Sequence, residues 1–337
     1  SSAASDVYKR QTNILPNADA LFLTAIDPYD HELWRWTFPV NKLNQQTEQL
    51  SPLSSRPAYT ETENELTVKA NKRTFIFSKK DGQLKGVSVD NRKISFANGP
   101  RFIGARRADR SLDQFYNHDD EKAKEKDRTY SEFPDAAVFT KLDVKQDGGD
   151  LVVTANYKLG NLDKAQWTIN PSGELALDYT YNFSGVVDLM GIRFDYPEDQ
   201  VISKRWLGAG PYRVWQNRIH GTQYDVWEND YNDPIPGETF TYPEFKGYFG
   251  DVSWMNIQTK EGTISLTNET PDAYIGVYQP RDGRDRLLYT LPESGISVLN
   301  VIPPVRNKVN STDLCGPSSQ PKWVNGPQTG RVIFRFM

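Results

Sequence analysis

The sequence predicts an all-β fold, and three features of the chain support this. Many short segments alternate apolar and polar residues, as strands with one buried face do. Glycine, proline, asparagine and aspartate gather between these segments, where turns are expected. No strand–helix–strand alternation follows the chain, which argues against an α/β fold. The length of 337 residues suits one large β domain and a smaller piece.

The first 58 residues divide into three pieces. Residues 1–11, SSAASDVYKRQ, lack the apolar core of a signal peptide. Their end, DVYKRQ, matches the translation of a common sequencing-transposon adapter, so we expect an adapter-derived scar, with an ordinary polar terminus as the alternative. Residues 12–50 hold two strand-like runs, Ala20–Ile26 and His31–Val40. Residues 51–58 are rich in serine and proline and predict a linker.

The large domain is expected to span residues 59–337. Lys80–Gln83, KDGQ, predicts a hairpin turn, because glycine tolerates a positive φ angle. Every second residue from Leu175 to Phe183 is apolar, so we expect one buried face there. Ser111–Arg128 has a helical composition, but its dense charge predicts a solvated loop or a short surface helix. Strands are expected at Leu66–Ala70, Thr74–Ser78, Leu151–Leu159, Ala165–Ile169, Glu174–Phe183, Gly191–Tyr196, Val252–Gln258, Thr263–Leu266, Ala273–Tyr278, Ser297–Ile302 and Val332–Phe336.

Charge and composition exclude several classes of protein. The net charge is −4 with both signs spread along the chain, whereas a nucleic-acid partner needs a basic face. No run of 18 apolar residues exists, so no transmembrane helix is expected. Cys315 is the single cysteine, which excludes an internal disulfide and a cysteine-based zinc site. We expect no cofactor and no metal. The compartment stays open between bacterial periplasm and cytoplasm, because the true N-terminus is expected to lie upstream.

The segment Trp206–Arg218, WLGAGPYRVWQNR, is the most informative part of the chain. Its two glycines and the following proline predict a loop without a regular element. Rigid aromatic rings beside fixed hydrogen-bonding groups are typical of a site that holds a sugar ring. We expect Tyr212 and Trp215 to be exposed and Trp254 to lie in the core; the alternative is a turn with buried tryptophan. The candidate carbohydrate-binding residues are Tyr212, Arg213, Trp215, Asn217, Arg218, His220, Glu244 and Lys246.

This segment resembles Trp-x-Gly-x-Gly-Pro-x-Glu-Asn-Tyr-x-Asp-Arg in the C-terminal β-sandwich of glycoside hydrolase family 2 β-galactosidases. The resemblance implies that residues 59–337 form the supersandwich of two large antiparallel sheets shared with galactose mutarotases. It also implies that residues 12–50 are a remnant of an immunoglobulin-like β-sandwich. Further segments similar to the family occur in its order over residues 60–337, namely Arg73–Val89, Asn98–Arg101, Leu189–Pro197, Tyr242–Gly247 and Asp251–Ile257.

The resemblance implies a role without catalysis. A retaining glycosidase needs two carboxylates about 5 Å apart, and in this family they lie on a (β/α)₈ barrel upstream of the region present here. No barrel pattern is found in this chain, so no catalytic residue is assigned and the isolated chain is expected to be inactive. We expect a C-terminal portion that contributes carbohydrate recognition and structural support to the missing barrel.

The expected partners are a carbohydrate and the catalytic barrel of the same polypeptide, and a homo-oligomer is compatible with the sequence. The chain loses carboxylates of the family pattern and gains Arg213 and Lys246. This change predicts a galactoside or an acidic, pectin-type glycan, whose carboxylate would meet one of these cations. Two alternatives remain open. One is a stand-alone sugar epimerase or polysaccharide lyase that uses His220 and Tyr212, and the other is a purely structural interaction domain.

Overall fold

A computed structural model describes residues 18–40, 55–107, 130–230, 247–277, 292–304 and 317–337. The chain divides into two compact units, Ser1–Glu48 and Gln49–Met337. In the described ranges the helices are short 3₁₀ turns, and every pair of named strands is antiparallel. The all-β prediction is therefore confirmed. None of these helices could span a membrane. The expected loop or surface helix at Ser111–Arg128 lies outside the described residues.

The first unit contains a hairpin of β1 (Ala20–Ile26) and β2 (Glu32–Pro39). The Asp27 carboxylate stabilises its turn, because one oxygen accepts hydrogen bonds from the backbone N–H groups of Tyr29 at 2.8 Å and His31 at 2.9 Å. Large apolar side chains on this hairpin are exposed, and Leu23 is 57% accessible. A two-stranded ribbon has no second layer that could bury them.

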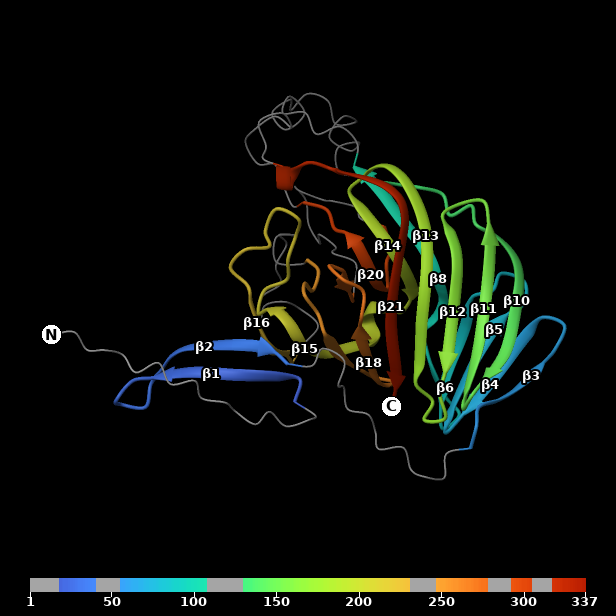
Figure 1. The fold of residues 1–337 in the computed structure, drawn as a ribbon, viewed down its shortest axis with the longest axis horizontal. Helices are drawn as coiled ribbons and strands as arrows, with labels where there is room; N and C mark the ends of the chain where they lie inside the picture. The colour runs from blue at the N-terminus through green and yellow to red at the C-terminus, as the bar shows by residue number, and fades with distance from the viewer. Residues whose placement is uncertain (1–17, 41–54, 108–129, 231–246, 278–291, 305–316) are drawn as a thin grey trace. The chain divides into compact units, whose positions relative to one another are not determined.

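The second unit contains a nine-stranded sheet that is prominent in Figure 1. Its strand order is β10-β11-β12-β13-β21-β18-β17-β15-β16, so the C-terminal strand lies in the middle. Long paired segments, above all β13 with β21, make this sheet continuous. The bounds are β10 (Val138–Asp147), β11 (Asp150–Lys158), β12 (Leu162–Ile169), β13 (Leu175–Val187), β15 (Val201–Gly210), β16 (Gln223–Asn229), β17 (Trp254–Thr259), β18 (Gly262–Asn268) and β21 (Lys322–Phe336).

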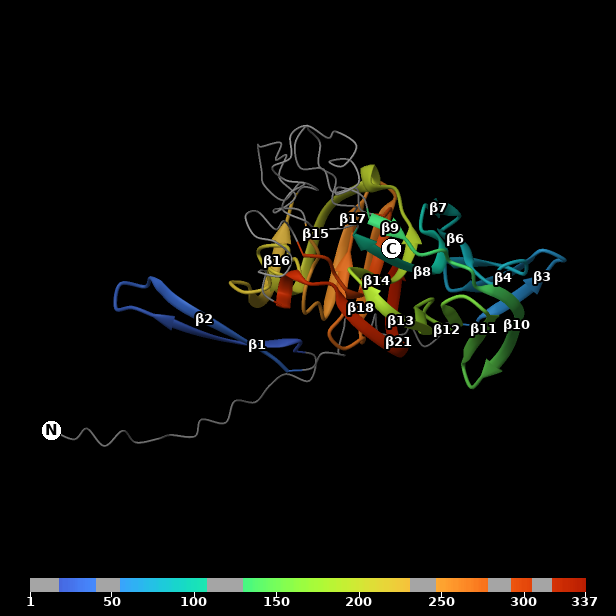
Figure 2. The same cartoon turned by 90° about the horizontal axis from the view of Figure 1, so that it is seen from above.

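A ten-stranded sheet forms the second layer (Figure 2). Its main path is β19-β20-β14-β8-β6-β5-β4-β3, while β7 pairs with β6 and β9 pairs with β8. Strands β14 and β8 lie side by side in the middle part of this path. The bounds are β3 (Ala58–Glu61), β4 (Glu65–Ala70), β5 (Arg73–Ser78), β6 (Leu84–Val89), β7 (Arg92–Ile94), β8 (Ala97–Arg107), β9 (Tyr130–Glu132), β14 (Leu189–Asp195), β19 (Tyr274–Gly276) and β20 (Ile296–Val301).

The main hydrophobic core lies between the two sheets. Phe194 of the ten-stranded sheet packs against Trp167 and Phe334 of the other sheet, with ring centroids 6.0 and 5.4 Å apart. The predicted buried face from Leu175 to Phe183 is confirmed, since these residues belong to or pack against the core. Burial of one such aromatic side chain stabilises the fold by roughly 1.5–3 kcal/mol. The two-layer sandwich is thus fixed by alternating apolar residues of both sheets.

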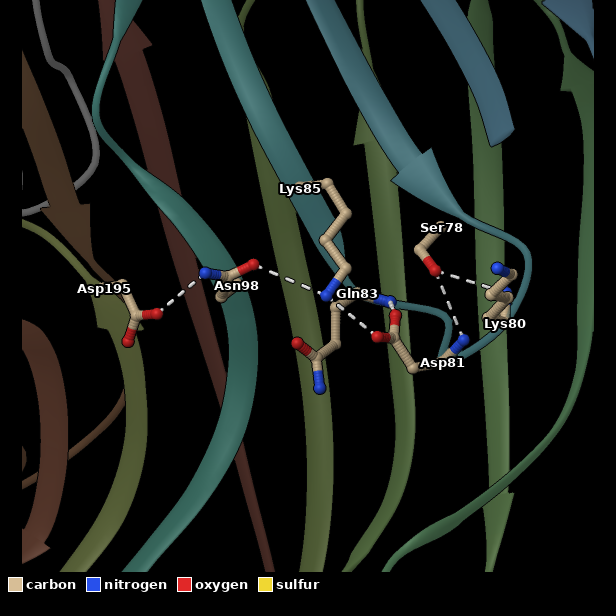
Figure 3. A network of polar contacts seen from close by, with 7 residues as sticks. All are labelled: Ser78, Lys80, Asp81, Gln83, Lys85, Asn98 and Asp195. Carbon is tan, nitrogen blue, oxygen red and sulfur yellow. Dashed lines mark hydrogen bonds and ion pairs between the residues drawn. The ribbon is translucent and has the colours of Figure 1, made fainter. Parts of the chain in front are cut away.

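The predicted Asp-Gly hairpin joins β5 to β6 (Figure 3). The Ser78 hydroxyl oxygen accepts hydrogen bonds from the N–H groups of Lys80 at 3.2 Å and Asp81 at 3.3 Å. The Asp81 carboxylate accepts one from the N–H of Gln83 at 3.1 Å, and Gly82 has a φ of 71°. Serine and aspartate side chains thus satisfy the backbone of this turn, as the sequence predicts.

Each predicted strand has a counterpart in the structure, and most ends shift by a few residues. The largest difference is at the C-terminus, where β21 begins at Lys322 instead of the predicted Val332. The expected loop at Trp206–Arg218 is wrong in its first part, because β15 continues to Gly210. The glycine at 210 serves close packing rather than a turn, since a Cβ atom there would lie 2.4 Å from Trp227 Cδ1. Glycine in a strand often marks such a close approach.

Candidate functional site

The predicted sugar-binding loop begins after β15. Trp215 is only 1% exposed, so its expected exposure is wrong. The reason is that the loop folds back onto the sheet: Val214 exchanges two backbone hydrogen bonds with Tyr248, of 2.7 and 2.9 Å. The Trp215 ring then meets the Tyr248 ring edge-on at 5.6 Å. Trp254, expected in the core, is half-buried, and the guanidinium of Arg205 lies 5.8 Å from its ring centre.

The remaining predicted residues are distributed over different environments. Tyr212 is 69% exposed, as predicted, whereas Arg213 is buried with its guanidinium 5.2 Å from the ring centre of Phe249. Asn217 is half-buried beside Ser319. The other four candidates divide into two that the structure describes and two that it does not. Arg218 and His220 are exposed, and Glu244 and Lys246 lie outside the described residues.

The loop helps to form a second apolar cluster, which we call the outer cluster. It lies on the face of the ten-stranded sheet opposite the main core, because side chains alternate along each strand. On β14, Met190 and Ile192 enter the main core, while Leu189 enters the outer cluster. The outer cluster consists of Ile103, Ala105, Tyr130, Leu189, Val214, Trp215, Tyr248, Leu299 and Ile302, with Tyr274 packed against it.

Beside the outer cluster, on the same face, four residues form what we call the polar row. Arg101 of β8 lies directly opposite Arg193 of β14, which in turn lies opposite Ser297 of β20. The row ends at Gly276 of β19, the partner of Ser297. Directly opposed residues on antiparallel strands have Cβ atoms about 5 Å apart. The register therefore places two guanidinium groups and one hydroxyl group side by side.

The polar row contains buried groups without hydrogen-bond partners. Arg101 donates to the Asp195 carboxylate, and Arg193 donates to the carbonyl oxygen of Glu293. The Nε atoms of both arginines and the Oγ atom of Ser297 are buried and have no partner among the described residues. Folded proteins pair nearly all buried polar groups, so three such groups in one row make it a candidate ligand site. These groups offer two N–H donors and a hydroxyl to an oxygen-rich ligand.

Polar contacts hold one end of the row in place (Figure 3). The amide of Asn98 donates to Asp195 at 2.8 Å and accepts from Lys85 at 3.4 Å. Lys85 also pairs with Asp81 at 2.8 Å. Burial alone would raise the pKa of Asp81, but the hydrogen bonds from Lys85 and the Gln83 N–H lower it overall. This network fixes the carboxylate of Asp195, which orients Arg101.

Electrostatics distinguish the two arginines of the polar row. Desolvation lowers the pKa of Arg193, and the charge of Arg101 lowers it further, against the opposing effect of Glu132, Asp195 and Asp135. Arg101 has a direct carboxylate partner in Asp195, whereas Arg193 forms no ion pair with a described carboxylate. The guanidinium of Arg193 therefore retains the larger unmet demand for an anionic or strongly polar partner.

Comparison with protein-family models identifies the domain. The model described as beta galactosidase small chain matches residues 69–303, well over half of the chain. The chain belongs to this family. Both strands that carry the arginines of the polar row lie inside the matched range. The small-chain domain is therefore the part of the molecule in which the candidate site is found.

Solved structures and curated proteins add little beyond the family. The chain is 11% identical to galactose 1-epimerase from Lactobacillus acidophilus NCFM, with a TM-score of 0.42 and coverage of 84% of this chain and 99% of that one. The chain is 12% identical to a putative aldose 1-epimerase from Escherichia coli K12, with a TM-score of 0.35 and coverage of 83% of this chain and 99% of that one. No curated protein matches the chain. Sequence identities and TM-scores this low give no basis for assigning the activity of these proteins to this chain.

A concave region lies on the outer face of the nine-stranded sheet. It is an open pocket of about 320 Å³ that includes Lys164, Asp178, Glu269 and Arg331. Arg331 bridges the carboxylates of Asp178 and Glu269, so these three charges are paired within the pocket. In the described residues no group of three or more metal-ligating side chains occurs. The polar row is therefore the better candidate for ligand binding.

Sequence reasoning missed the polar row as a site. Asn98–Arg101 and Leu189–Pro197 stood out only as segments similar to a family. The available signal was the alternation in LMGIRFDYP, where Arg193 and Asp195 occupy the face opposite to buried Ile192 and Phe194. Charged residues at these alternating positions predict a face that does not enter the main core. That signal does not reveal that Ser297, about 100 residues later, is the neighbour.

Proposed function

We propose that this small-chain domain is the non-catalytic C-terminal portion of a family 2 glycoside hydrolase. In this role it contributes carbohydrate recognition and structural support to a catalytic barrel. Its partners are the barrel of the same polypeptide and a glycan, either a galactoside or an acidic, pectin-type sugar. In this proposal the polar row contacts the glycan. The observation that carries it is the set of three buried polar atoms, at Arg101, Arg193 and Ser297, that have no hydrogen-bond partner in the part of the chain that the structure describes.

The geometry of the row suits sugar hydroxyls. Sugar-binding sites combine a few fixed polar groups with apolar walls, and the row lies directly beside the outer cluster. Gly276 keeps the end of the row narrow, since a Cβ atom there would lie 2.3 Å from Ser297 Oγ and 3.6 Å from Tyr248 Cδ1. Arg101 and Asp195 are partly exposed, so a ligand can approach from that side.

Structural support of the barrel is assigned to the loop after β15 and the chain around the start of β21. Gln216 donates to the carbonyl oxygen of Gln320 at 2.8 Å, which ties these two segments together. Each segment exposes a large aromatic side chain: Tyr212 is 69% and Trp323 is 71% accessible. In the proposed role, these two exposed side chains contact the surface of the barrel. Tyr212, Arg218 and His220 remain candidates for such contacts or for sugar contacts.

The carbohydrate part of the proposal is tested by calorimetric and NMR titration of the full chain with galactose and galacturonate. Binding of either sugar is expected, and Gly276→Val should abolish it because the new side chain fills the row. Gly149→Val is the matched control, since a Cβ atom there meets nothing closer than 3.8 Å. If Gly276→Val does not fold, Arg101→Gln tests the site instead. It adds no bulk and is expected to weaken sugar binding. Absence of binding to both sugars would contradict the proposal.

The non-catalytic part is tested by turnover of aryl galactosides and by mutarotation of galactose. We expect neither reaction with the purified chain. The epimerase or lyase alternative depends on His220, which is exposed and has no hydrogen bond or ion pair in the described residues. Turnover that is lost in His220→Ala would establish that alternative and overturn the proposed role.

A further inference from the structure

We propose that the polar row recognises the carboxylate of an acidic sugar, with Arg193 as the principal cation. This inference rests on the proposed function and specifies its ligand class as a uronic acid rather than a neutral hexose. It assigns the carboxylate to Arg193 and Arg101, in place of Arg213 or Lys246. Arg213 is buried against Phe249, which occupies one face of its guanidinium.

The first line of support is the incomplete pairing of Arg193. Its hydrogen bond in the described residues goes to a neutral acceptor, the carbonyl oxygen of Glu293, and its Nε atom is buried without a partner. Asp195 does not compensate for this, because its two oxygens are bound by Arg101 and Asn98. Glu132 and Asp135 act on Arg193 only through their charge, without an ion pair. Among the described residues, one positive charge of the row therefore lacks a direct counter-charge.

The second line of support is the position of Arg101 opposite Arg193. Like charges directly opposed across two strands destabilise a sheet. A carboxylate placed between these guanidinium groups removes the repulsion and accepts hydrogen bonds from both Nε–H groups. Charge-assisted hydrogen bonds of this kind are shorter and stronger than neutral ones. A neutral hydroxyl would accept the hydrogen bonds but would leave the repulsion in place.

The third line of support is Ser297, which follows Arg193 in the row. Its side chain is fully buried, its Oγ atom has no described partner, and it lies directly opposite Arg193. The hydroxyl can therefore donate to a carboxylate oxygen that Arg193 already holds. Charge and hydrogen-bond donors then converge from β8, β14 and β20, which are rigid strands of one sheet. Such preorganised donors discriminate strongly between ligands that do and do not match them.

The test compares galacturonate with galactose, which differ only in the group at C6, by calorimetric titration of the full chain. We expect galacturonate to bind at least about tenfold more tightly, as one charge-assisted hydrogen bond allows. Arg193→Gln should remove this preference, whereas Arg193→Lys should retain part of it. Lys145→Gln, which removes an exposed cation elsewhere, is the matched control and should leave the preference unchanged.

The outcomes separate this inference from the proposed function. Equal affinity for the two sugars would overturn the carboxylate assignment and leave carbohydrate recognition intact. No binding of either sugar would overturn both. A preference that persists in Arg193→Gln would place the carboxylate elsewhere. Circular dichroism checks the fold of each variant. If Arg193→Gln is unfolded, Ser297→Ala tests the carboxylate assignment instead. It should weaken galacturonate binding severalfold more than galactose binding.

Discussion

The two faces of strand β14 have different neighbours. On the inner face, Met190, Ile192 and Phe194 are fully buried against the opposing sheet. On the outer face, Leu189 is covered by the outer cluster, but Arg193 lies beyond it in the polar row. The inner face is covered by a whole sheet, whereas the described part of the loop after β15 covers the outer face at Leu189 and does not reach Arg193. Our proposal thus assigns stability and ligand recognition to opposite faces of one strand.

The largest effect is expected on the inner face. Phe194→Ala should lower the free energy of unfolding by about 3–5 kcal/mol, because it removes a ring that contacts both sheets and leaves a cavity. Urea unfolding followed by tryptophan fluorescence measures this change. Ile202→Ala, at a position 43% exposed, is the control and should change little. A loss below about 1 kcal/mol for Phe194→Ala would mean that the two sheets are not held together as described.

The next effect tests whether the outer cluster is a true core. Trp215→Ala should cost about 3 kcal/mol, since Trp215 is buried against Tyr248. Tyr212→Ala, three residues earlier in the same loop, should stay within about 0.5 kcal/mol because Tyr212 is exposed. Thermal unfolding of the two variants makes the comparison. Similar losses for both would show that the loop does not pack as described.

A smaller effect concerns the narrow end of the polar row. Gly276→Ala should destabilise the fold by about 1–3 kcal/mol, because the new Cβ atom would lie 2.3 Å from Ser297 Oγ. Combining it with Ser297→Gly should recover most of that loss by removing the clashing atom. A double-mutant cycle of unfolding free energies measures the coupling. Additive effects would indicate that the two residues do not meet.

The smallest effect concerns Asp81, whose pKa is lowered in the folded state. A lowered folded pKa contributes stability above the unfolded value near 3.8 and loses it as the pH falls through the folded pKa. Asp81→Asn keeps an acceptor for the turn but removes the charge. We expect it to cost about 0.5 kcal/mol at pH 7, since Asp81 and Lys85 are partly exposed and screened by solvent.

This cost should shrink when unfolding is measured at successively lower pH, because both proteins then carry a neutral side chain at this position. Lys85→Met should show the same trend, since it removes the partner charge. A cost that is constant down to about pH 2 would mean that the Asp81 charge contributes nothing and that only its hydrogen bonds to the turn matter.

Local sequence patterns accounted for most of the strands and for part of the loop chemistry. Alternation predicted the buried face from Leu175 to Phe183, and the Asp-Gly pair predicted the hairpin before β6. The exposure of Tyr212 was predicted, but the burial of Trp215 was not. A Gly-Pro turn looks the same whether its aromatic residue points to solvent or folds back onto a sheet. That choice depends on Tyr248, which lies more than 30 residues away in sequence.

The sequence by itself determined the all-β class, the spacing of the strands and which residues share a face, because side-chain alternation is a local property of extended backbone. Only the tertiary structure decided which strands are neighbours and in which register. The polar row exists because Arg101, Arg193 and Ser297 meet through two such pairings across almost 200 residues. For strands that are distant in sequence, register follows from the packing of whole faces, so the local pattern of one strand does not specify its partner.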